Sequence, residues 1–364
     1  MRHRYFALVP LLLLSACWDG TDHATDKAND RTGTFLALPL LAGYLSSEAA
    51  AVSADGRVIA GSSRNRAGLT QAFRWTSAQG AMPLGLLPQG SFSTARAISG
   101  DGGTIVGIAD GGTPSGLHAF RWTVDLGLTQ LDGLPNANVC SASAVSSDGS
   151  VIVGTCLAPM NEAFRWTPAT GSVRLGRFGT GSNAASSAST VSSDGATVGG
   201  AGHPALTGAV IWNASNTATI IGGLPGDTNG TILALSHDGT IAAGASVESN
   251  GLQRAFRWTS ATGPVPLTTD SAYVGATPTA MSADGRRMTG WVGRGGGGPD
   301  VAVLWDASGH LRPVSDLLST EAVMATAGWS LTRARGISAD GRTIVGDGID
   351  PDGTGRGWIV TLND

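Results

Sequence analysis

Ile98-Ser99-Gly100-Asp101-Gly102 and, about twenty residues later, Ala119-Phe120-Arg121-Trp122-Thr123 are two short phrases that return along this chain. The first phrase is an apolar residue followed by Ser, any residue, Asp and Gly. It occurs seven times, with its aspartates at Asp55, Asp101, Asp148, Asp194, Asp238, Asp284 and Asp340. Five of the six intervals are 44 to 47 residues long, and the last is 56. A fixed period of this length indicates a repeat architecture in which each unit is one supersecondary element.

The second unit shows what one repeat contains. Its pattern predicts strands at residues 94–99, 104–108, 118–123 and 128–134. Asp101 and Gly102 supply the first turn, because Asp and Gly tolerate the left-handed backbone of tight hairpins. Four short strands in about 46 residues are the content of one β-propeller blade. The predicted fold class is therefore all-β: a seven-bladed β-propeller with four antiparallel strands per blade.

The two ends of the repeat region predict that the ring closes. Nearly every first strand is rich in small residues, and we expect these to face a crowded central axis. The fold begins at 35–39, which aligns with the fourth strand at 84–88, whereas it ends at 358–362, which is only a third strand. We therefore expect the N-terminal strand to complete the last blade and to leave no open sheet edge there.

The N-terminal segment has the pattern of an export signal. A basic start, Arg2 to Arg4, precedes an apolar stretch, Phe6 to Leu14, that is too short to span a bilayer. Leu14-Ser15-Ala16-Cys17 resembles a bacterial lipobox, which implies cleavage before Cys17 and lipid on its sulfur. The alternative is an ordinary secretory signal in which Cys17 is incidental.

These features divide the chain into three parts. Residues 1–16 are the predicted lipoprotein signal peptide, residues 17–33 the lipidated Cys and a flexible polar tether, and residues 34–364 the propeller. Trp18 follows the cysteine where the inner-membrane retention signal of enteric lipoproteins has Asp. The predicted location is therefore the bacterial outer membrane, with the protein held by its lipid anchor and either periplasmic or surface-exposed.

Composition excludes one class of partner. The net charge is −4 and Lys27 is the sole lysine, so we do not expect a surface that binds nucleic acid phosphates. We expect contact with the membrane only through the lipid anchor, and a monomeric protein.

The two repeated phrases each have a structural and a ligand-binding interpretation. In the second phrase, Phe and Trp alternate along one strand and so share a face, which predicts packing between neighbouring blades rather than an aromatic ligand row. In two units Val210 and Val303 stand where the other units have Phe. In the last unit Trp358 fits either the Phe or the Trp position of the phrase. In the first phrase, the Asp fits a turn role better than a calcium role, which needs further oxygens.

Together the phrases resemble the HAF family of bacterial extracellular repeats. The resemblance covers residues 34–364 almost entirely, and its specificity comes from the recurrence of Ser-x-Asp-Gly and Ala-Phe-Arg-Trp in register. The third strands of units four, six and seven depart from the pattern. The resemblance implies architecture and an extracellular location, and it carries no assigned activity.

The longer and more variable connections indicate where a binding site belongs. Those between strands two and three, and between successive units, share one face of a propeller, as binding loops on a rigid scaffold do. We expect function on this loop face, around the mouth of the central channel. Its candidate binding residues are Arg64, Arg66, His118, Glu162, His203, Asp227, Glu248, Arg254, Tyr273 and Trp291. Each is also consistent with a solvated loop residue.

The sequence favours a non-enzymatic binding or interaction scaffold, with an envelope protein or a polysaccharide as its partner. The alternative is a propeller glycan hydrolase or lyase, which needs two carboxylates about 5 to 9 Å apart across a cleft. Glu162, Asp227 and Glu248 lie on different units and could converge. No catalytic constellation is clustered in the sequence, and the chain has few glutamates, which favours the scaffold.

No cofactor, catalytic residue or metal ligand is assigned from the sequence. The six histidines, at positions 3, 23, 118, 203, 237 and 310, show no metal-ligand spacing. Asp347, Asp350 and Asp352 form one acidic loop that resembles the start of a calcium loop but lacks the bidentate Glu, so calcium there stays an open alternative.

Two cysteines flank the third repeat turn. Cys140 and Cys156 each lie eight residues from Asp148, so a regular hairpin would place them opposite each other. We expect a disulfide between them in an oxidising envelope compartment, as a stabiliser of the third blade. The alternative is a pair of free thiols.

Overall fold

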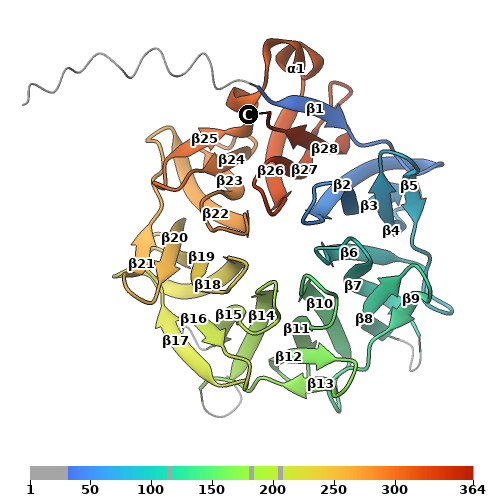
Figure 1. The fold of residues 1–364 in the computed structure, drawn as a ribbon, viewed down its shortest axis with the longest axis vertical. Coiled ribbons are helices and arrows are strands. Elements are labelled where there is room, and N and C mark those ends of the chain that lie inside the picture. Colours follow the sequence, from blue (N-terminus) through green and yellow to red (C-terminus); the bar gives the residue numbers. More distant parts are fainter. Residues whose placement is uncertain (1–31, 113–115, 180–183, 204–207, 364) are drawn as a thin grey trace, which may run out of the picture.

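The computed structural model describes residues 32–112, 116–179, 184–203 and 208–363, and these form an all-β fold, as predicted. The strands lie in groups of four around a central axis (Figure 1). Five sheets have four strands each, and a sixth has eight because one parallel bridge, Val139 to Leu117, joins two groups of four. The signal peptide and most of the tether, including Cys17, lie outside the described residues.

We number the groups as units 1 to 7 in chain order. Unit 1 contains β2 (Tyr44–Val52), β3 (Val58–Asn65), β4 (Thr70–Thr76) and β5 (Gly80–Pro83). Unit 2 contains β6 (Ser93–Ile98), β7 (Thr104–Gly111), β8 (Gly116–Thr123) and β9 (Gly127–Gln130). Unit 3 contains β10 (Val139–Val145), β11 (Ile152–Leu157), β12 (Asn161–Thr167) and β13 (Gly171–Arg174). Unit 4 contains β14 (Ala185–Val191), β15 (Val198–His203), β16 (Gly208–Trp212) and β17 (Ala218–Gly222).

The remaining units follow the same order. Unit 5 contains β18 (Thr228–Leu235), β19 (Ile241–Val247), β20 (Gln253–Thr259) and β21 (Gly263–Pro266). Unit 6 contains β22 (Tyr273–Met281), β23 (Met288–Arg294), β24 (Val301–Trp305) and β25 (Leu311–Pro313). Unit 7 contains β26 (Ser330–Ile337), β27 (Thr343–Ile349), β28 (Gly355–Thr361) and, from the other end of the chain, β1 (Thr34–Ala37).

The two ends of the chain meet in unit 7. β1 pairs antiparallel with β28, with Phe35 opposite Val360 and Ala37 opposite Trp358. The longer last interval contains a 3-10 turn, η2 (Val314–Leu317), and a short helix, α1 (Thr320–Ala325), whose apolar residues pack against unit 7. No helix among the described residues is both long and apolar enough to cross a membrane.

Each Ser-x-Asp-Gly phrase forms a turn that is held by its own side chains. In unit 1, Ser53 Oγ donates to Asp55 Oδ1 at 2.6 Å, and Asp55 Oδ1 accepts from the Arg57 amide at 3.0 Å. Ser53 Oγ also accepts from the Val58 amide at 3.0 Å. The equivalent hydrogen bonds lower the pKa of the aspartate carboxyl in most repeats. In unit 5, hydrogen bonds from Ser236 and Thr240 lower the pKa of Asp238 to about 2. The Asp therefore has the predicted turn role.

The seven turns are hydrogen-bonded to one another in a closed circle. Ala54 N donates to Gly100 O at 2.9 Å, and Ala339 N donates back to Ala54 O at 3.0 Å. The steps between are Asp101 N to Ser147 O, Ser147 N to Ser193 O, Ser193 N to His237 O, His237 N to Ala283 O, and Ala283 N to Ala339 O. Backbone bonds thus link each unit to the next around the axis.

A glycine on every second strand lies under an aromatic ring or its replacement. Phe73 lies opposite Gly61 in the register of β3 and β4, and a Cβ built on Gly61 would come within 2.4 Å of the Phe73 ring. The aromatic and the missing Cβ are therefore complementary. The equivalent pairs are Phe120 with Gly107, Phe164 with Gly154, Phe256 with Gly244, Val210 with Gly200, Val303 with Gly290, and Trp358 with Gly346. Trp358 thus takes the phenylalanine slot.

In units 4 and 6, valine replaces the phenylalanine, and the tryptophan two residues later on the same strand fills the space that the smaller side chain leaves. Trp212 and Trp305 are fully buried, and each indole N–H donates to a backbone carbonyl at 3.0 Å, of Leu175 and Thr268 respectively. In unit 6 the ring of Trp305 reaches the space above Gly290. The aromatic pairs therefore belong to the packing between units, as expected.

The same glycines accommodate a β-bulge in every first strand. A Cβ on Gly61 would lie 2.3 Å from the backbone oxygen of Glu48, and the corresponding distance is between 1.9 and 2.3 Å in all seven units. Directly after this carbonyl the pairing of the first two strands shifts by one residue, between Ala49 and Ala51 in unit 1 and at the equivalent place in each other unit. Bulges of this kind redirect a side chain.

The small residues of the first strands take two positions, so the expectation that they face the axis holds only in part: Ala50 lines the channel, and Ala49 and Ala95 border it. Ala49, Ala95, Ala142, Ala188 and Ala334 are buried between sheets. The extra residue of each bulge lines the channel instead, because the bulge turns it away from the sheet.

We expect Gly61→Ala to destabilise the fold strongly. The added methyl would overlap both the Glu48 carbonyl and the Phe73 ring, and overpacking of this kind costs about 1 to 3 kcal/mol. Urea unfolding monitored by tryptophan fluorescence measures the effect. Gly355→Ala is the matched control, because no atom lies within 4 Å of the place its methyl group would take. Equal unfolding midpoints for both variants would contradict the packing role of Gly61.

Candidate functional site

The bulge residues form one layer of side chains around the central channel. All seven line a cavity of about 570 Å³, here called the channel cavity. They are Ala50, Arg96, Ser143, Ser189, Leu233, Thr279 and Arg335, one from each unit. Repetition therefore fixes where these side chains point, while the residue type differs from unit to unit, with two arginines on the side of units 7, 1 and 2.

An apolar layer narrows the channel at the end where the repeat turns lie. It consists of the apolar residue that opens each phrase: Val52, Ile98, Val145, Val191, Leu235, Met281 and Ile337. The pocket that these residues and the turns line has a volume of only about 140 Å³. The space available to a ligand thus lies toward the other end, which is the loop face.

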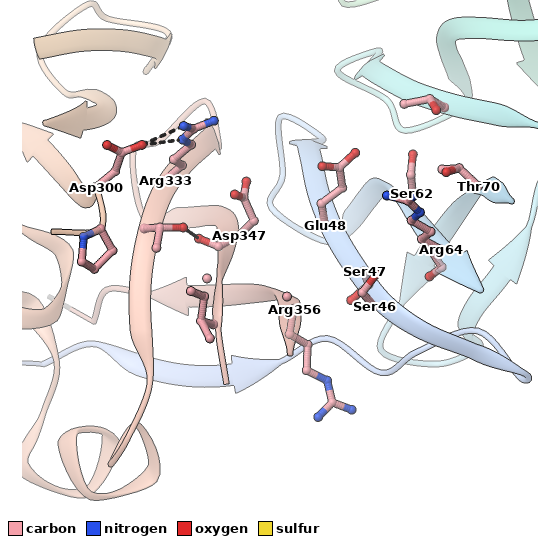
Figure 2. Close-up of a pocket in the computed structure, with 17 residues that line it drawn as sticks. Ser46, Ser47, Glu48, Ser62, Arg64, Thr70, Asp300, Arg333, Asp347 and Arg356 are labelled. Carbon is pink, nitrogen blue, oxygen red and sulfur yellow. Dashed lines mark hydrogen bonds and ion pairs between the residues drawn. The ribbon is translucent and has the colours of Figure 1, made fainter. Parts of the chain in front are cut away.

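A second cavity opens on the loop face between units 7 and 1 and has a volume of about 610 Å³. We call it the mouth cavity. It shares Glu48 and Thr94 with the channel cavity, so the two spaces adjoin. Figure 2 shows Glu48 and Arg64 on the unit 1 side of this space, and Arg333 and Asp347 on the unit 7 side. Each volume is in the range of small-molecule binding sites.

Three of the cavity arginines have carboxylate partners; Arg356 lies 3.6 Å from Asp350 Oδ2, and the other two are held more closely. Arg333 donates through Nε and a terminal nitrogen to Asp300 Oδ2, at 2.9 and 2.7 Å, and its guanidinium lies 5.0 Å from the centre of the Trp291 ring. Arg335 Nε donates to Asp347 Oδ1 at 2.6 Å. These contacts fix both side chains and the indole in the wall.

Arg64 and Arg96 are different. Within the described part of the chain neither makes a hydrogen bond or an ion pair, and both are exposed to solvent. Each nevertheless lines one of the two cavities. Their guanidinium groups are therefore available to a ligand.

Glu48 is the carboxyl that both cavities share. Burial raises its pKa above the ordinary 4.5, the nearby Arg335 opposes this, and the charge of Asp347 adds to it. The side chain is half-buried and its carboxyl group faces the cavities beside Arg335 and Arg96. Glu48 can therefore carry a proton at a higher pH than an exposed glutamate.

Sequence reasoning identified only part of this site. Of its candidates, Arg64 lines the mouth cavity and Trp291 lines the channel cavity, on β23 rather than on a loop. Arg66 is exposed at the tip of the loop after β3, outside both cavities.

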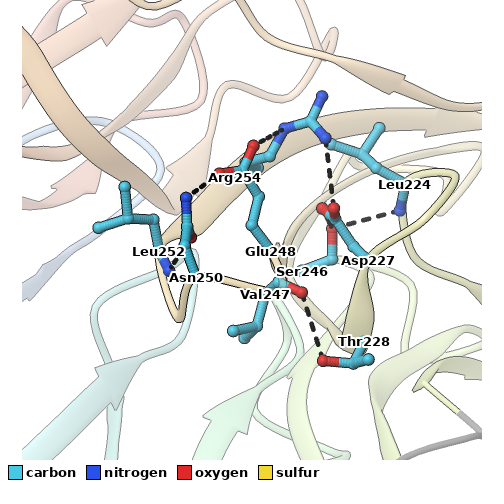
Figure 3. A network of polar contacts seen from close by, with 9 residues as sticks. All are labelled: Leu224, Asp227, Thr228, Ser246, Val247, Glu248, Asn250, Leu252 and Arg254. Carbon is cyan, nitrogen blue, oxygen red and sulfur yellow. Dashed lines mark hydrogen bonds and ion pairs between the residues drawn. The ribbon is translucent and has the colours of Figure 1, made fainter.

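A second group of candidates forms a brace that ties the connection between units 4 and 5 to unit 5. Arg254 binds Asp227 Oδ1 at 3.2 Å and Glu248 Oε1 at 3.3 Å, as Figure 3 shows. Ser246 donates to the other oxygen of Asp227 at 2.7 Å, and Asn250 donates to the other oxygen of Glu248 at 2.8 Å. Asp227 and Glu248 do converge, but on one shared guanidinium.

The brace borders a separate pocket of about 370 Å³. Tyr273, Glu248 and Arg254 line it. Because both carboxylates are engaged by Arg254 and by neighbouring side chains, they act as supports for the wall of this pocket.

The other candidates lie apart from one another. Glu162 lies on β12, is buried, and pairs with Arg174 and with Arg177, the latter at 3.7 Å, which corrects its placement on an exposed loop. His118 lies on β8 with Nδ1 3.2 Å from Gln130 Nε2, beside a pocket of about 260 Å³. His203 is exposed at the end of β15. The ten candidates therefore do not form a single site.

The acidic loop of unit 7 is organised by hydrogen bonds. Asp350 Oδ1 accepts from the amides of Asp352 and Thr354, at 3.1 and 2.9 Å, and its other oxygen lies 3.6 Å from Arg356. Asp347 points to Arg335 instead. The described residues contain no group of three His, Cys, Asp or Glu side chains that could hold a metal ion.

Cys140 and Cys156 lie opposite each other in the pairing of β10 and β11, and a disulfide joins them. Their Cα atoms are 4.1 Å apart. The bridge ties the first two strands of unit 3 together.

Glu48, Arg96, Arg333 and Arg335 were missed from the sequence. The available signal was a charged residue in an innermost strand that is otherwise small or apolar, as in Ser47-Glu48-Ala49 and Ala95-Arg96-Ala97. That signal becomes visible only when the seven first strands are aligned on their Ser-x-Asp-Gly turns.

Comparison with known proteins supports the fold. No family model matches the chain, and no curated protein does. Among solved structures, an oligogalacturonate lyase in complex with manganese aligns with a TM-score of 0.57 at 13% identity, over 91% of both chains. An oligogalacturonate lyase from Vibrio parahaemolyticus aligns with a TM-score of 0.57 at 11% identity, over 91% of this chain and 92% of that one.

A third structure is the β-propeller domain of the Trilobed protease from Pyrococcus furiosus, for which an open velcro topology is described. It aligns with a TM-score of 0.57 at 9% identity, over 88% of this chain and 96% of that one. Identities this low show a shared fold alone, so the chain has the all-β fold of β-propeller proteins.

We expect the Glu48 carboxyl to titrate above pH 4.5, and Arg335→Gln to raise its pKa further, because the guanidinium favours the charged form. The chain has four glutamates, at positions 48, 162, 248 and 321, so labelling the glutamate side-chain carboxyl with ¹³C gives four NMR signals. The signal that is missing from the Glu48→Gln variant belongs to Glu48. Arg66→Gln is the control variant.

The same shift predicts a pH dependence of stability. Since the folded state binds more protons than the unfolded state above pH 4.5, the free energy of unfolding should fall as pH rises through the folded pKa of Glu48. Glu48→Gln should lack this decrease. A Glu48 signal that titrates at or below 4.5 would contradict the assignment.

Proposed function

We propose that this chain is a seven-bladed β-propeller, closed by β1 in the last blade, that acts as a lipid-anchored binding scaffold of the bacterial cell envelope. Its partner, an envelope protein or a polysaccharide, binds at the loop face without being chemically changed. Cys17 carries the lipid, and the polar residues that follow are the tether. The β1–β28 pairing and the closed circle of turn hydrogen bonds support the closed ring.

The observation that carries the binding role is the charge of the two adjoining cavities. Five arginines and three carboxylates line them, although the chain as a whole has a net charge of −4. The arginines are Arg64, Arg96, Arg333, Arg335 and Arg356, and the carboxylates are Glu48, Asp300 and Asp347. A local cationic excess at an open mouth of an acidic protein favours a partner with negative or strongly polar groups.

A glycan hydrolase or lyase is the second candidate, and one observation favours it. Glu48 is a carboxyl with a raised pKa in a cavity, which is a frequent property of catalytic acids. Of the three carboxylates that the sequence put forward for this chemistry, Asp227 and Glu248 are bound to Arg254 and Glu162 pairs with Arg174 and Arg177, all outside the two cavities. If the wild-type protein releases new chain ends from a glycan and the Glu48→Gln variant does not, the protein is an enzyme.

We expect Cys17→Ala to abolish lipidation. In cells grown with a labelled fatty acid, the wild-type protein should carry the label and sediment with membranes, whereas the variant should carry none and should leave the membrane fraction. Cys140→Ala with Cys156→Ala, which alters the other two cysteines, is the control and should keep the label. An unlabelled wild-type protein would contradict the anchor.

We expect the partner to be captured from the loop face. A photoreactive side chain at position 64, in the full-length protein in its own envelope, should give a discrete cross-linked species. The same side chain at position 126, an exposed site on the strand 3 to 4 turn of unit 2, is the control and should give none. Adducts only from position 126, or from neither position, would rule out binding at the loop face.

A further inference from the structure

We propose that the mouth and channel cavities bind the end of an acidic oligosaccharide, a chain of sugar rings that carry carboxylates, with Arg64 and Arg96 as the residues that take the negative charge. This inference rests on the proposed binding function and names the ligand class of the same site.

The arginines of the two cavities differ in whether they are already paired. Arg333 and Arg335 already have carboxylate partners in Asp300 and Asp347. Arg64 and Arg96 line the cavities and make no hydrogen bond or ion pair within the described part of the chain, although Arg96 is near enough to Glu48 to favour its charged form, so binding an anion to them breaks no existing ion pair. Arginine binds carboxylates through parallel hydrogen bonds, which makes these two residues suited to a uronate-type group.

The rest of the cavity wall suits a ligand with hydroxyl groups. Ser143, Ser189 and Thr94 line the channel cavity, and their hydroxyls make no hydrogen bond within the described part of the protein. A ligand with many hydroxyls satisfies such groups, whereas a simple inorganic anion leaves most of them unused.

Glu48 fits this ligand better than it fits a plain anion. A carboxylate repels an anion that has no hydroxyl groups, whereas beside an acidic sugar it can accept a hydrogen bond from a ring hydroxyl. Because Glu48 lies in both cavities near Arg96, it can contact the sugar ring whose carboxylate Arg96 binds.

One wall of the channel cavity is aromatic. Trp291 lines the channel cavity on the unit 6 side, and Arg333 holds its ring in place. A flat indole of this kind gives the apolar face of a sugar ring a surface to pack against. The cavity therefore offers cations, hydroxyls and one aromatic ring, which together match an acidic sugar.

The shape of the channel indicates which part of the glycan binds. The apolar layer of Val52 and its six equivalents narrows the far end, and only about 140 Å³ is available there. The side chains of this layer offer the hydroxyl and carboxylate groups of a glycan no hydrogen-bond partners. A glycan therefore enters from the loop face and stops, so its terminal residues occupy the two cavities.

Calorimetric titration of the detergent-solubilised full-length protein tests this. The probes are trigalacturonate, the trisaccharides of glucuronate and mannuronate, neutral galactotriose, and a tri-glutamate peptide. At least one uronate trisaccharide should bind, and galactotriose and the peptide should bind about tenfold more weakly or not at all. Arg96→Gln and Arg64→Gln should each weaken uronate binding about tenfold or more, and Arg66→Gln should leave it unchanged. Uronate affinity should also fall as salt is raised.

Three results would overturn the inference: no binding of any uronate trisaccharide, equal binding of galactotriose, or tighter binding of the glutamate peptide. Loss of uronate binding in Arg66→Gln but not in Arg96→Gln would place the site elsewhere and overturn it too. If cross-linked species still form from position 64 while every saccharide fails, the binding scaffold stands and the ligand class is wrong. If both experiments fail, the proposed function fails with it.

Discussion

The glycine in the middle of each second strand is the constraint on which the rest of the structure depends. At all seven positions the first-strand carbonyl lies between 1.9 and 2.3 Å from where a Cβ would be, so no other residue fits without movement of the backbone. The third strand places an aromatic ring, or the valine that replaces it, against the same glycine. One absent methyl group therefore brings three strands together in every unit.

This close approach has two consequences at different distances from the axis. Toward the outside, the ring over the glycine fills the space between neighbouring units, and where valine replaces phenylalanine the buried Trp212 and Trp305 fill it instead. Toward the axis, the first strand bulges at the next position and turns one side chain per unit into the channel. Core packing and the lining of the channel are therefore set by the same contact.

The channel layer shows how a repeated scaffold carries a site that is not repeated. The backbone places a side chain at the same level in all seven units, and the turns fix the units to one another through their circle of hydrogen bonds. Among the described residues, the charged side chains that line the two cavities come from units 7, 1 and 2 and, through Asp300, from unit 6. The difference in residue type at equivalent positions, and not a difference in fold, concentrates arginines and carboxylates on one side of the mouth.

The sequence by itself determined the architecture of the repeat. The period of 44 to 47 residues, the Ser-x-Asp-Gly turns and the alternating Phe and Trp predicted four strands per unit, because turn chemistry and strand periodicity are local properties. It also predicted which strand from the N-terminus would pair with Trp358 and its neighbours, and which two cysteines would face each other. These follow from position within a repeat.

Only the tertiary structure decided which residues meet around the channel. Glu48, Arg96 and Arg335 are far apart in the sequence, and a bulge, which no local pattern announced, turns two of them inward. The same structure removed Glu162, Asp227 and Glu248 from the candidate site, because each forms ion pairs with arginines of its own surroundings. Contacts between units depend on how seven copies close around an axis, and a linear pattern does not contain that information.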